Sequence, residues 1–410
     1  MTKVSSSNGL EKCPKLRFPG FNEAIKANNL SKYLVENKDR NKALVYDQSD
    51  VLSVSGEYGV VNQIEFQGRS FAGKSVADYH LVETNDIVYT KSPLKANPYG
   101  IIKVNKGVTG IVSTLYAVYH PLPDVVPQYI DYYFDYDLRL NKYLKPLVNI
   151  GAKHDMKVDN ETVLTGEVFF PSCSEQKKIV DFLTTIDKLI RKKRTLVDAL
   201  KKYKRGAVRY LLSTKSCPLR NARWTTAKIG ELGSFVKGAP LSKADISEDG
   251  TPFILYGELY TTYNEVVTSI KRRTKAQVDE IFLSHVGDVV IPTSGETPEE
   301  ISTASCIMLP NVILAGDLNI FRGDKVDGRI LSYLLNHVVN TKIARIAQGK
   351  SVVHIQASEL CKLTLTYPDK NTQKTIIGFL SLLNDKIMNE ENSLAFLSDL
   401  KEGLMQQLFI

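Results

Sequence analysis

Two stretches of the chain alternate apolar and polar positions with a period that predicts long helices. The apolar positions step by four and three residues from 179 to 211, and they step in the same way from 376 to 408. This spacing is typical of the narrow apolar seam of a coiled coil. We therefore predict two helices, over about 174–213 and 371–410, each roughly 60 Å long and each preceded by a proline.

The seam is expected to form the contact between the two helices as an antiparallel pair. Its residues are Ile179, Leu183, Ile186, Ile190, Lys193, Val197 and Leu200 in the first helix and Ile376, Leu380, Leu383, Ile387, Glu390, Leu394 and Leu397 in the second. In this arrangement Ile186 should lie near Leu397. By the same symmetry Leu200 should lie near Leu383.

One charged residue interrupts the seam near the middle of each helix, Lys193 in the first and Glu390 in the second. Lys193 and Glu390 are equivalent at an offset of 197 residues, so they should occupy neighbouring layers and meet as an opposite-charge pair. A polar layer of this kind typically fixes the register of a helix pair. The alternative is that each helix packs only on its own domain and that both charges reach water separately.

The two halves of the chain repeat each other. Pro171 matches Pro368 and Gly206 matches Gly403 at the offset of 197, and residues 85–88 resemble 287–290 at an offset of 202. The repeat divides the chain into an N-terminal tail at 1–13, a first mixed domain at 14–170, a first helix at 171–217, a second mixed domain at 218–367 and a second helix at 368–410.

Each mixed domain is predicted to be α+β. Strand-like runs occur at 86–90, 111–119 and 163–170 in the first domain and at 289–292, 312–320 and 361–367 in the second. One helical run, at 128–148 or 328–347, lies between the last two strands of each domain. The fold class is therefore two tandem α/β domains separated by two long helices.

Charge and composition narrow the possible functions. The net charge is +8, and residues 171–217 alone carry 13 basic and 4 acidic groups, as suits a nucleic-acid or acidic partner or simple solubility. Five cysteines without a C-x-x-C pair argue against a disulfide framework, and six scattered histidines argue against a metal site. With no membrane-length apolar run and no signal peptide, we expect a cytoplasmic protein that does not enter a membrane.

Several short motifs resemble catalytic sites but lack the required context. Gly68–Ser75 matches the P-loop pattern G-x-x-x-x-G-K-[ST], yet a turn follows it where a phosphate-binding helix is needed. Asn97-Pro98-Tyr99 lacks the second proline of an amino-methyltransferase signature, and the chain contains no G-x-G. We therefore expect no catalytic residues, no metal and no cofactor.

The duplicated helical region resembles a known family. The residues that carry this resemblance are Pro171-x-x-x-Glu175-Gln176-x-x-Ile179, Leu200-x-x-x-Lys204-Arg205-Gly206-x-x-x-x-Leu211, the opening 15–21, the segments 79–93 and 287–295, and Trp224-x-x-x-Lys228-Ile229-Gly230-Glu231-Leu232. Together they are similar to the specificity subunits of Type I restriction–modification systems. The chain departs from the family pattern at Thr372 and Glu402, and the first domain lacks the opening Trp.

The resemblance implies a non-enzymatic subunit that reads double-stranded DNA. Two target-recognition domains would each read half of a bipartite, asymmetric site, modification subunits would methylate adenine, and a restriction subunit would add cleavage. Two alternatives stay open. One is a nucleotide-hydrolysing enzyme built on Gly68–Ser75, and the other is a scaffold that uses only the coiled coil.

The candidate DNA contacts are chosen from stretches that are rich in basic and poor in acidic residues. Both mixed domains are neutral overall, so local charge separation must supply the phosphate contacts. The candidates are Lys91, Lys95, Lys103, Lys106, Arg139, Lys142, Lys153 and His154 in the first domain, and Lys271, Arg272, Arg273, Lys275, Arg345, Lys350 and His354 in the second. A solvated helix face is the alternative interpretation for each of them.

Overall fold

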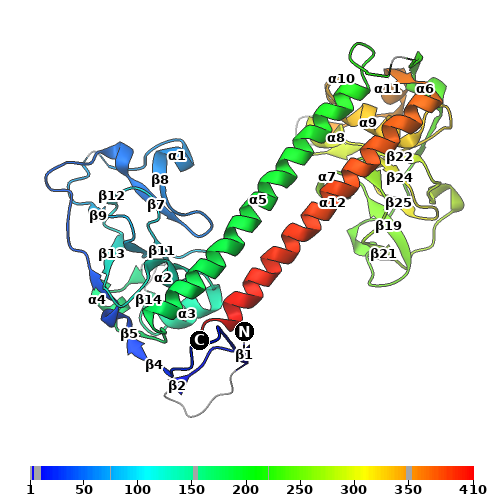
Figure 1. Ribbon diagram of the computed structural model, residues 1–410. Helices are drawn as coiled ribbons and strands as arrows, with labels where there is room; N and C mark the ends of the chain where they lie inside the picture. Colours follow the sequence, from blue (N-terminus) through cyan, green and yellow to red (C-terminus); the bar gives the residue numbers. More distant parts are fainter. Residues whose placement is uncertain (1, 4–10, 74, 151–155, 220, 348–352) are drawn as a thin grey trace. The chain divides into compact units, whose positions relative to one another are not determined.

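A computed structural model describes residues 2–3, 11–73, 75–150, 156–219, 221–347 and 353–410 (Figure 1). The chain forms two compact units. Unit 1 comprises residues 1–193 with 393–410, and unit 2 comprises residues 194–392. Each unit therefore contains one mixed domain and a part of both long helices.

The two predicted helices are present with nearly the predicted bounds. Helix α5 spans Cys173–Leu211 and helix α12 spans Lys370–Gln407. None of the predicted seam residues is exposed, whereas other apolar residues of the helices, such as Leu196 and Phe396, are. A stripe that is withdrawn from water along both helices is what a coiled-coil seam requires.

Each unit pairs the beginning of one helix with the end of the other. In unit 1, Leu183 of α5 lies in the same core as Met405 of α12, and Asp187 binds Lys401 at 2.9 Å. In unit 2, Lys201 of α5 binds Glu391 of α12 at 2.6 Å. These contacts confirm the antiparallel pairing.

Glu390, the charged residue in the middle of the second seam, has a hydrogen-bond partner on its own helix. Glu390 is buried, and its carboxylate accepts a hydrogen bond from Lys386 at 2.6 Å, one turn away on the same helix. The pairing of Glu390 with Lys193, and the proximity of Ile186 to Leu397 and of Leu200 to Leu383, stay predictions.

Unit 1 is built around a four-stranded antiparallel sheet with the order β11-β10-β13-β6. Its strands are β1 (Thr2–Lys3), β2 (Glu11–Lys12), β3 (Leu16–Arg17), β4 (Ile25–Lys26), β5 (Asn28–Asn29), β6 (Leu34–Glu36), β7 (Leu52–Ser55), β8 (Gly59–Asn62), β9 (His80–Val82), β10 (Ile87–Thr90), β11 (Ile101–Val104), β12 (Gly110–Val112), β13 (Tyr116–Pro121), β14 (Asn149–Ile150), β15 (Met156–Lys157) and β16 (Glu167–Val168). Its helices are α1 (Gln63–Gln67), α2 (Pro127–Phe134), α3 (Asp137–Leu144), α4 (Asn160–Val163) and two 3-10 turns, Leu30–Lys32 and Gln48–Asp50.

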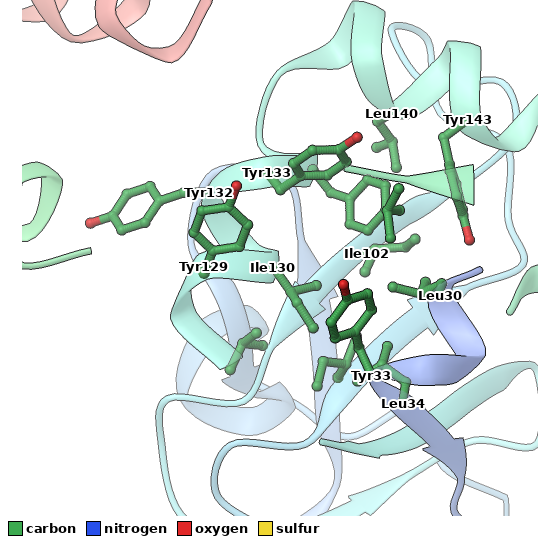
Figure 2. Packing of buried hydrophobic residues seen from close by; sticks show 14 of the residues in the cluster. Leu30, Tyr33, Leu34, Ile102, Tyr129, Ile130, Tyr132, Tyr133, Leu140 and Tyr143 are labelled. Atoms are coloured by element: carbon green, nitrogen blue, oxygen red, sulfur yellow. The ribbon is translucent and has the colours of Figure 1, made fainter. Parts of the chain in front are cut away.

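Aromatic residues of α2 form the centre of the unit 1 core. In Figure 2, Ile130 of α2 and Ile102 of the sheet lie between Tyr129 and Leu30 of the first 3-10 turn, and all four belong to one core. Tyr132 points away from the other labelled tyrosines, and its hydroxyl donates a hydrogen bond to Asp187 of α5 at 2.6 Å. The same helix thus covers the sheet and holds the long helix.

Unit 2 contains a five-stranded sheet with the order β18-β26-β22-β24-β20, in which only β20 and β24 are parallel. Its strands are β17 (Trp224–Lys228), β18 (Ser234–Lys237), β19 (Thr251–Leu255), β20 (Val266–Val267), β21 (Arg273–Thr274), β22 (Asp288–Pro292), β23 (Ser294–Gly295), β24 (Ser305–Ile307), β25 (Ile313–Ala315), β26 (Leu318–Arg322), β27 (Val353–His354) and β28 (Thr364–Pro368). Its helices are α6 (Ile229–Leu232), α7 (Glu258–Thr261), α8 (Pro298–Ile301), α9 (Gly328–His337), α10 (Asn340–Ile346), α11 (Ala357–Lys362) and two 3-10 turns, Lys243–Asp245 and Glu280–Phe282.

The strand register confirms the internal repeat. Ile87 faces Val104 on one side and Tyr119 on the other, while Val289 faces Cys306 and Phe321. All three positions are related by the offset of 202 residues. The two mixed domains therefore share their central strands, pair for pair.

The predicted helical runs and last strands differ from the observed ones in detail. Each run is two helices, α2 and α3 or α9 and α10, because a residue outside the helical region, Tyr136 or Val339, turns the chain between them. The predicted strand at 163–170 is reduced to β16, because residues 160–163 form α4.

A glutamine ties each long helix to its own domain. The side chain of Gln176 accepts the backbone N–H of Val126 at 2.8 Å, just before α2. Gln373 accepts the backbone N–H of Asp327 at 2.9 Å, just before α9. Each glutamine amide also donates to the carbonyl of the proline five residues earlier. The Gln shared by both helices is thus a structural joint.

A buried ion pair adds a second joint in unit 1 only. Arg17 of β3 binds both carboxylate oxygens of Glu175, at 2.8 and 2.7 Å, and the two residues are 4% and 1% exposed. In the second helix Thr372 replaces Glu175 and donates its hydroxyl hydrogen to Asp369 at 2.8 Å. At this position a hydrogen bond at the start of α12 therefore takes the place of the Arg17–Glu175 ion pair.

We predict that Arg17→Met strongly destabilises unit 1. The substitution leaves the Glu175 carboxylate buried without its bidentate partner, which should cost about 3–5 kcal/mol in the free energy of unfolding measured with urea. The double variant with Glu175→Leu should recover most of the loss. Lys42→Ala, which breaks an exposed ion pair with Asp78, should have no measurable effect. An equal loss in the single and double variants would contradict this account.

Candidate nucleic-acid interface

The loop after β10 in unit 1 carries two of the candidate lysines. Asn97 donates to the Asp137 carboxylate at 2.9 Å, and Asn141 of α3 donates to the Ala96 carbonyl at 3.0 Å, so the loop lies against α3. Lys95 on the loop is exposed, as is Lys142 on α3. Lysines from two elements therefore lie on adjoining segments.

Lys91, at the start of the same loop, is half-buried. Burial lowers the pKa of its amine, and the nearby Arg40 lowers it further, while Asp159 and Glu36 act in the opposite direction. Arg40 also forms a backbone bridge to the buried His80. Lys91 therefore lies among groups of both signs, with Arg40 on one side of the balance and Asp159 and Glu36 on the other.

Three other candidates in unit 1 are committed to protein partners. Lys103 is buried and binds Asp135 at 2.5 Å, and Lys106 binds Asp131 at 2.5 Å. Arg139 donates to the carbonyls of Tyr133 and Met405 at 2.9 Å and stacks on Phe409, so it anchors the end of α12. These three side chains therefore serve the packing of unit 1.

In unit 2 the equivalent segment follows β22. Its short strand β23 pairs with β27, which places His354 opposite Ser294. Helix α8 contacts β23, β27 and α10, and α10 carries the exposed Lys342 and Arg345. His354 and Arg345 are therefore brought to neighbouring elements, as Lys95 and Lys142 are in unit 1.

The basic run 271–275 belongs to a different part of unit 2. It lies around β21, in the three-stranded sheet β21-β19-β25. Arg272 binds Glu258 at 2.8 Å, Lys275 binds Asp249 at 2.8 Å, and the Arg273 guanidinium donates to the Gly250 carbonyl at 2.8 Å. Lys271 is exposed, and its backbone N–H donates to the Tyr263 hydroxyl. The local excess of charge is therefore smaller than the sequence suggests.

Three candidates, Lys153, His154 and Lys350, lie outside the described residues. In each unit the remaining basic side chains lie on the second helix of the helical run, α3 or α10, and on a segment beside it. The first basic face consists of the half-buried Lys91 and the exposed Lys95 and Lys142. The second consists of the candidates Arg345 and His354 together with Lys342, an exposed residue of α10 that was not among the candidates. Exposed lysines and arginines on the edge of an otherwise neutral domain are suited to phosphate contacts.

The described residues around the P-loop pattern, 63–73 and 75–82, do not have the strand–loop–helix order of a nucleotide-binding loop. Gly68 terminates the short helix α1, with φ 75°, and the Phe71 backbone N–H donates to the Gln63 side chain. The helix thus precedes the glycine-rich segment, and residues 76–79 form a turn before β9. A P-loop needs a helix that begins at this segment, so the nucleotide-enzyme alternative loses its structural basis.

Metal sites and membrane spans are both absent from the described residues. They contain no group of three or more His, Cys, Asp or Glu side chains arranged to hold a metal ion. Of the helices in this part of the chain, none combines the length and apolarity of a membrane span.

Comparison with known proteins assigns the second half of the chain. Residues 221–396 match the model of the Type I restriction modification DNA specificity domain. The match is to this part of the chain and concerns the second mixed domain with most of the second long helix. The matched residues include the second basic face, and the strand register of unit 1 repeats the central strands of the matched domain. No curated protein matches the sequence.

Two solved structures share the fold over nearly the whole chain. The S subunit of a Type-I restriction-modification system from M. genitalium is 13% identical, with a TM-score of 0.59 over 97% of this chain and 99% of that one. A chain from a study of assembly and conformational transition in the type I R-M system is 14% identical, with a TM-score of 0.56 over 96% and 99%. At these identities the similarity concerns the fold.

Two kinds of residue in these surfaces could not be picked out from the sequence as members of a site. The first is Asn97 and Asn141, which hold the basic loop on α3; they are ordinary polar residues in sequence and give no signal. The second is Lys204 and Lys401, which form ion pairs inside the units. The sequence does mark these two lysines, because both interrupt the apolar seam at equivalent positions.

We predict that the double variant Lys95→Ala/Lys142→Ala binds duplex DNA with a weaker salt dependence. Each lost phosphate contact should lower the slope of log affinity against log salt by about 1. The measurement is binding to a non-specific duplex between about 50 and 200 mM salt. Lys42→Ala in the same domain is the control. An unchanged slope in the double variant would remove these two lysines from the interface.

Proposed function

We propose that this chain is the DNA-reading subunit of a Type I restriction–modification complex. The match of residues 221–396 to the DNA specificity domain carries this proposal. The repeated strand register extends the same interpretation to unit 1. DNA recognition by such domains combines phosphate contacts from basic side chains with hydrogen bonds to base edges.

Two domains of different sequence on one chain favour an asymmetric bipartite target. The first domain would read one half-site and the second domain the other, and the long helices would set the non-specific spacer. Because one face of B-DNA recurs every 34–36 Å, the centres of the half-sites should lie roughly one turn apart.

Exchanging residues 218–367 for the corresponding domain of another specificity subunit should change one half of the methylated site only. The other half-site and the spacer should persist, because the first domain and both helices are retained. The measurement is N6-methyladenine mapping in cells that express the exchanged chain with its modification subunit. Simultaneous change of both halves would contradict the two-reader proposal.

The chemistry is proposed to reside in partner subunits. This chain would act in the cytoplasm without a cofactor, modification subunits would transfer the methyl group, and a restriction subunit would join them for cleavage. In support, the matched family is a specificity family, and the Gly68–Ser75 segment lacks P-loop geometry in the described residues.

The outer face of α5 in unit 2 offers a place for a modification subunit. Leu196, Tyr203 and Tyr210 are spaced seven residues apart and are 40%, 58% and 51% exposed. A groove of about 700 Å³ runs beside them, lined by Gly206 and by Phe379 of α12. A narrow apolar stripe with heptad spacing fits one more helix, which we propose comes from the modification subunit.

Tyr203→Asp should weaken assembly with the modification subunit while leaving binding to duplex DNA unchanged. The new charge would have to be desolvated when a helix covers the groove. Tyr58→Asp is the matched control, because Tyr58 is 59% exposed but lies in the first mixed domain. Assembly can be measured by analytical ultracentrifugation of the two subunits. Equal assembly by both variants would show that the groove is not the docking surface.

A further inference from the structure

Two equivalent lysines occupy seam positions that the heptad pattern reserves for apolar residues. They are Lys204 of α5 and Lys401 of α12, related by the offset of 197. In unit 2, the Lys204 amine lies 2.6 Å from a Glu265 carboxylate oxygen, and the other oxygen lies 2.6 Å from His337 Nε2. The three side chains are only 11–12% exposed. Lys204 is therefore committed to the recognition domain and is not presented to DNA.

The first unit contains the corresponding arrangement with different acids. The Lys401 amine lies 2.9 Å from the Asp187 carboxylate and 3.8 Å from that of Asp135. Lys401 also lies over the Tyr132 ring, 5.5 Å from its centroid, as Lys204 lies 5.7 Å from the centroid of the Tyr333 ring. Such cation–π contacts are strongest where the amine is partly desolvated.

The two tyrosines are themselves equivalent and are held in the same way. Tyr132 on α2 and Tyr333 on α9 differ by 201 residues, the same offset that relates Val126 to Asp327 at the glutamine joints. Asp187 accepts the Tyr132 hydroxyl at 2.6 Å, and Asn384, its equivalent, donates to the Tyr333 hydroxyl at 2.8 Å. Each tyrosine is thus bound by the helix of its own repeat.

Each tyrosine is also covered by the lysine of the other repeat. Lys401, from the second repeat, lies on Tyr132 of the first, and Lys204, from the first, lies on Tyr333 of the second. Apolar contacts tolerate sliding of a helix, whereas a buried ion pair has one favourable geometry. The contact therefore specifies the position of the domain along the helix from the other repeat.

We propose that Lys204 and Lys401 are positioning residues that lock each recognition domain onto the helix of the other repeat, and so fix the spacer length of the DNA target. This inference rests on the proposed reading of a bipartite site. Glu265 supplies supporting evidence. Burial would raise the pKa of its carboxyl, but the His337 hydrogen bond and the Lys204 charge outweigh burial and lower the pKa to about 2.

The test uses the assembled methyltransferase with Lys204→Met and a panel of duplexes. The half-sites stay constant, and the spacer is the native length or is one or two base pairs shorter or longer. Lys204→Met should reduce the preference for the native spacer over its neighbours by about tenfold or more, equivalent to about 1.4 kcal/mol, without changing the preferred half-sites. Lys401→Met should act in the same direction through the other domain.

Lys201→Met is the control, because Lys201 lies three residues away on α5 in a more exposed pair with Glu391. The double variant Lys204→Met/Glu265→Gln removes the buried carboxylate together with the lysine that neutralises it. It should therefore fold, and it should still show a relaxed preference for spacer length. A folded double variant with the native spacer preference would overturn the proposal. Failure of the unmodified complex to prefer any bipartite duplex would instead overturn the proposed function.

Discussion

The burial of two long apolar seams is the constraint on which the rest of the structure depends. Helix α5 has 39 residues, roughly 60 Å at the usual rise, and its seam continues through both units. Leu183 completes the core of unit 1, while Val208 of the same helix completes the core of unit 2. Helix α12 does the same in reverse order, with Leu380 and Met405. Neither recognition domain has a complete core without the helix of the other repeat.

Polar contacts then select one position of each domain along the two helices. The glutamine joints fix the start of each helix on its own domain, and the lysine contacts fix its far end on the other domain. Hydrophobic association is roughly proportional to area and is not directional, so it cannot select one helix position by itself. Directional contacts at both ends of each helix supply that selection.

The repetitive parts of the fold could be predicted from the sequence, because repetition is visible in one chain. The seam, the antiparallel pairing and the correspondence of the central strands follow from offsets of 197 and 202 residues. The breaks at Tyr136 and Val339 could not be predicted, since a single residue outside the helical region has no periodic signal.

The candidate interface was predicted less completely, because charge was counted along the chain and not in space. Lys103 lies in an acid-free stretch, yet it binds Asp135, 32 residues later. Arg139 likewise binds the carbonyl of Met405, 266 residues away. Such long-range contacts withdraw basic side chains from a predicted surface, and nothing in the neighbouring sequence indicates them. Lys95 and Lys142 remain, because they are exposed on a loop and on a helix and form no ion pair with another described residue.

The most direct test of the DNA-reading role is reconstitution of methylation from purified subunits. A random duplex library would be incubated with S-adenosylmethionine and with this chain, the modification subunit, or both, and methylated adenines would be mapped. The account predicts one asymmetric bipartite motif, methylated only when both proteins are present. Methylation by this chain alone, or a motif that is unchanged when this chain is omitted, would contradict it.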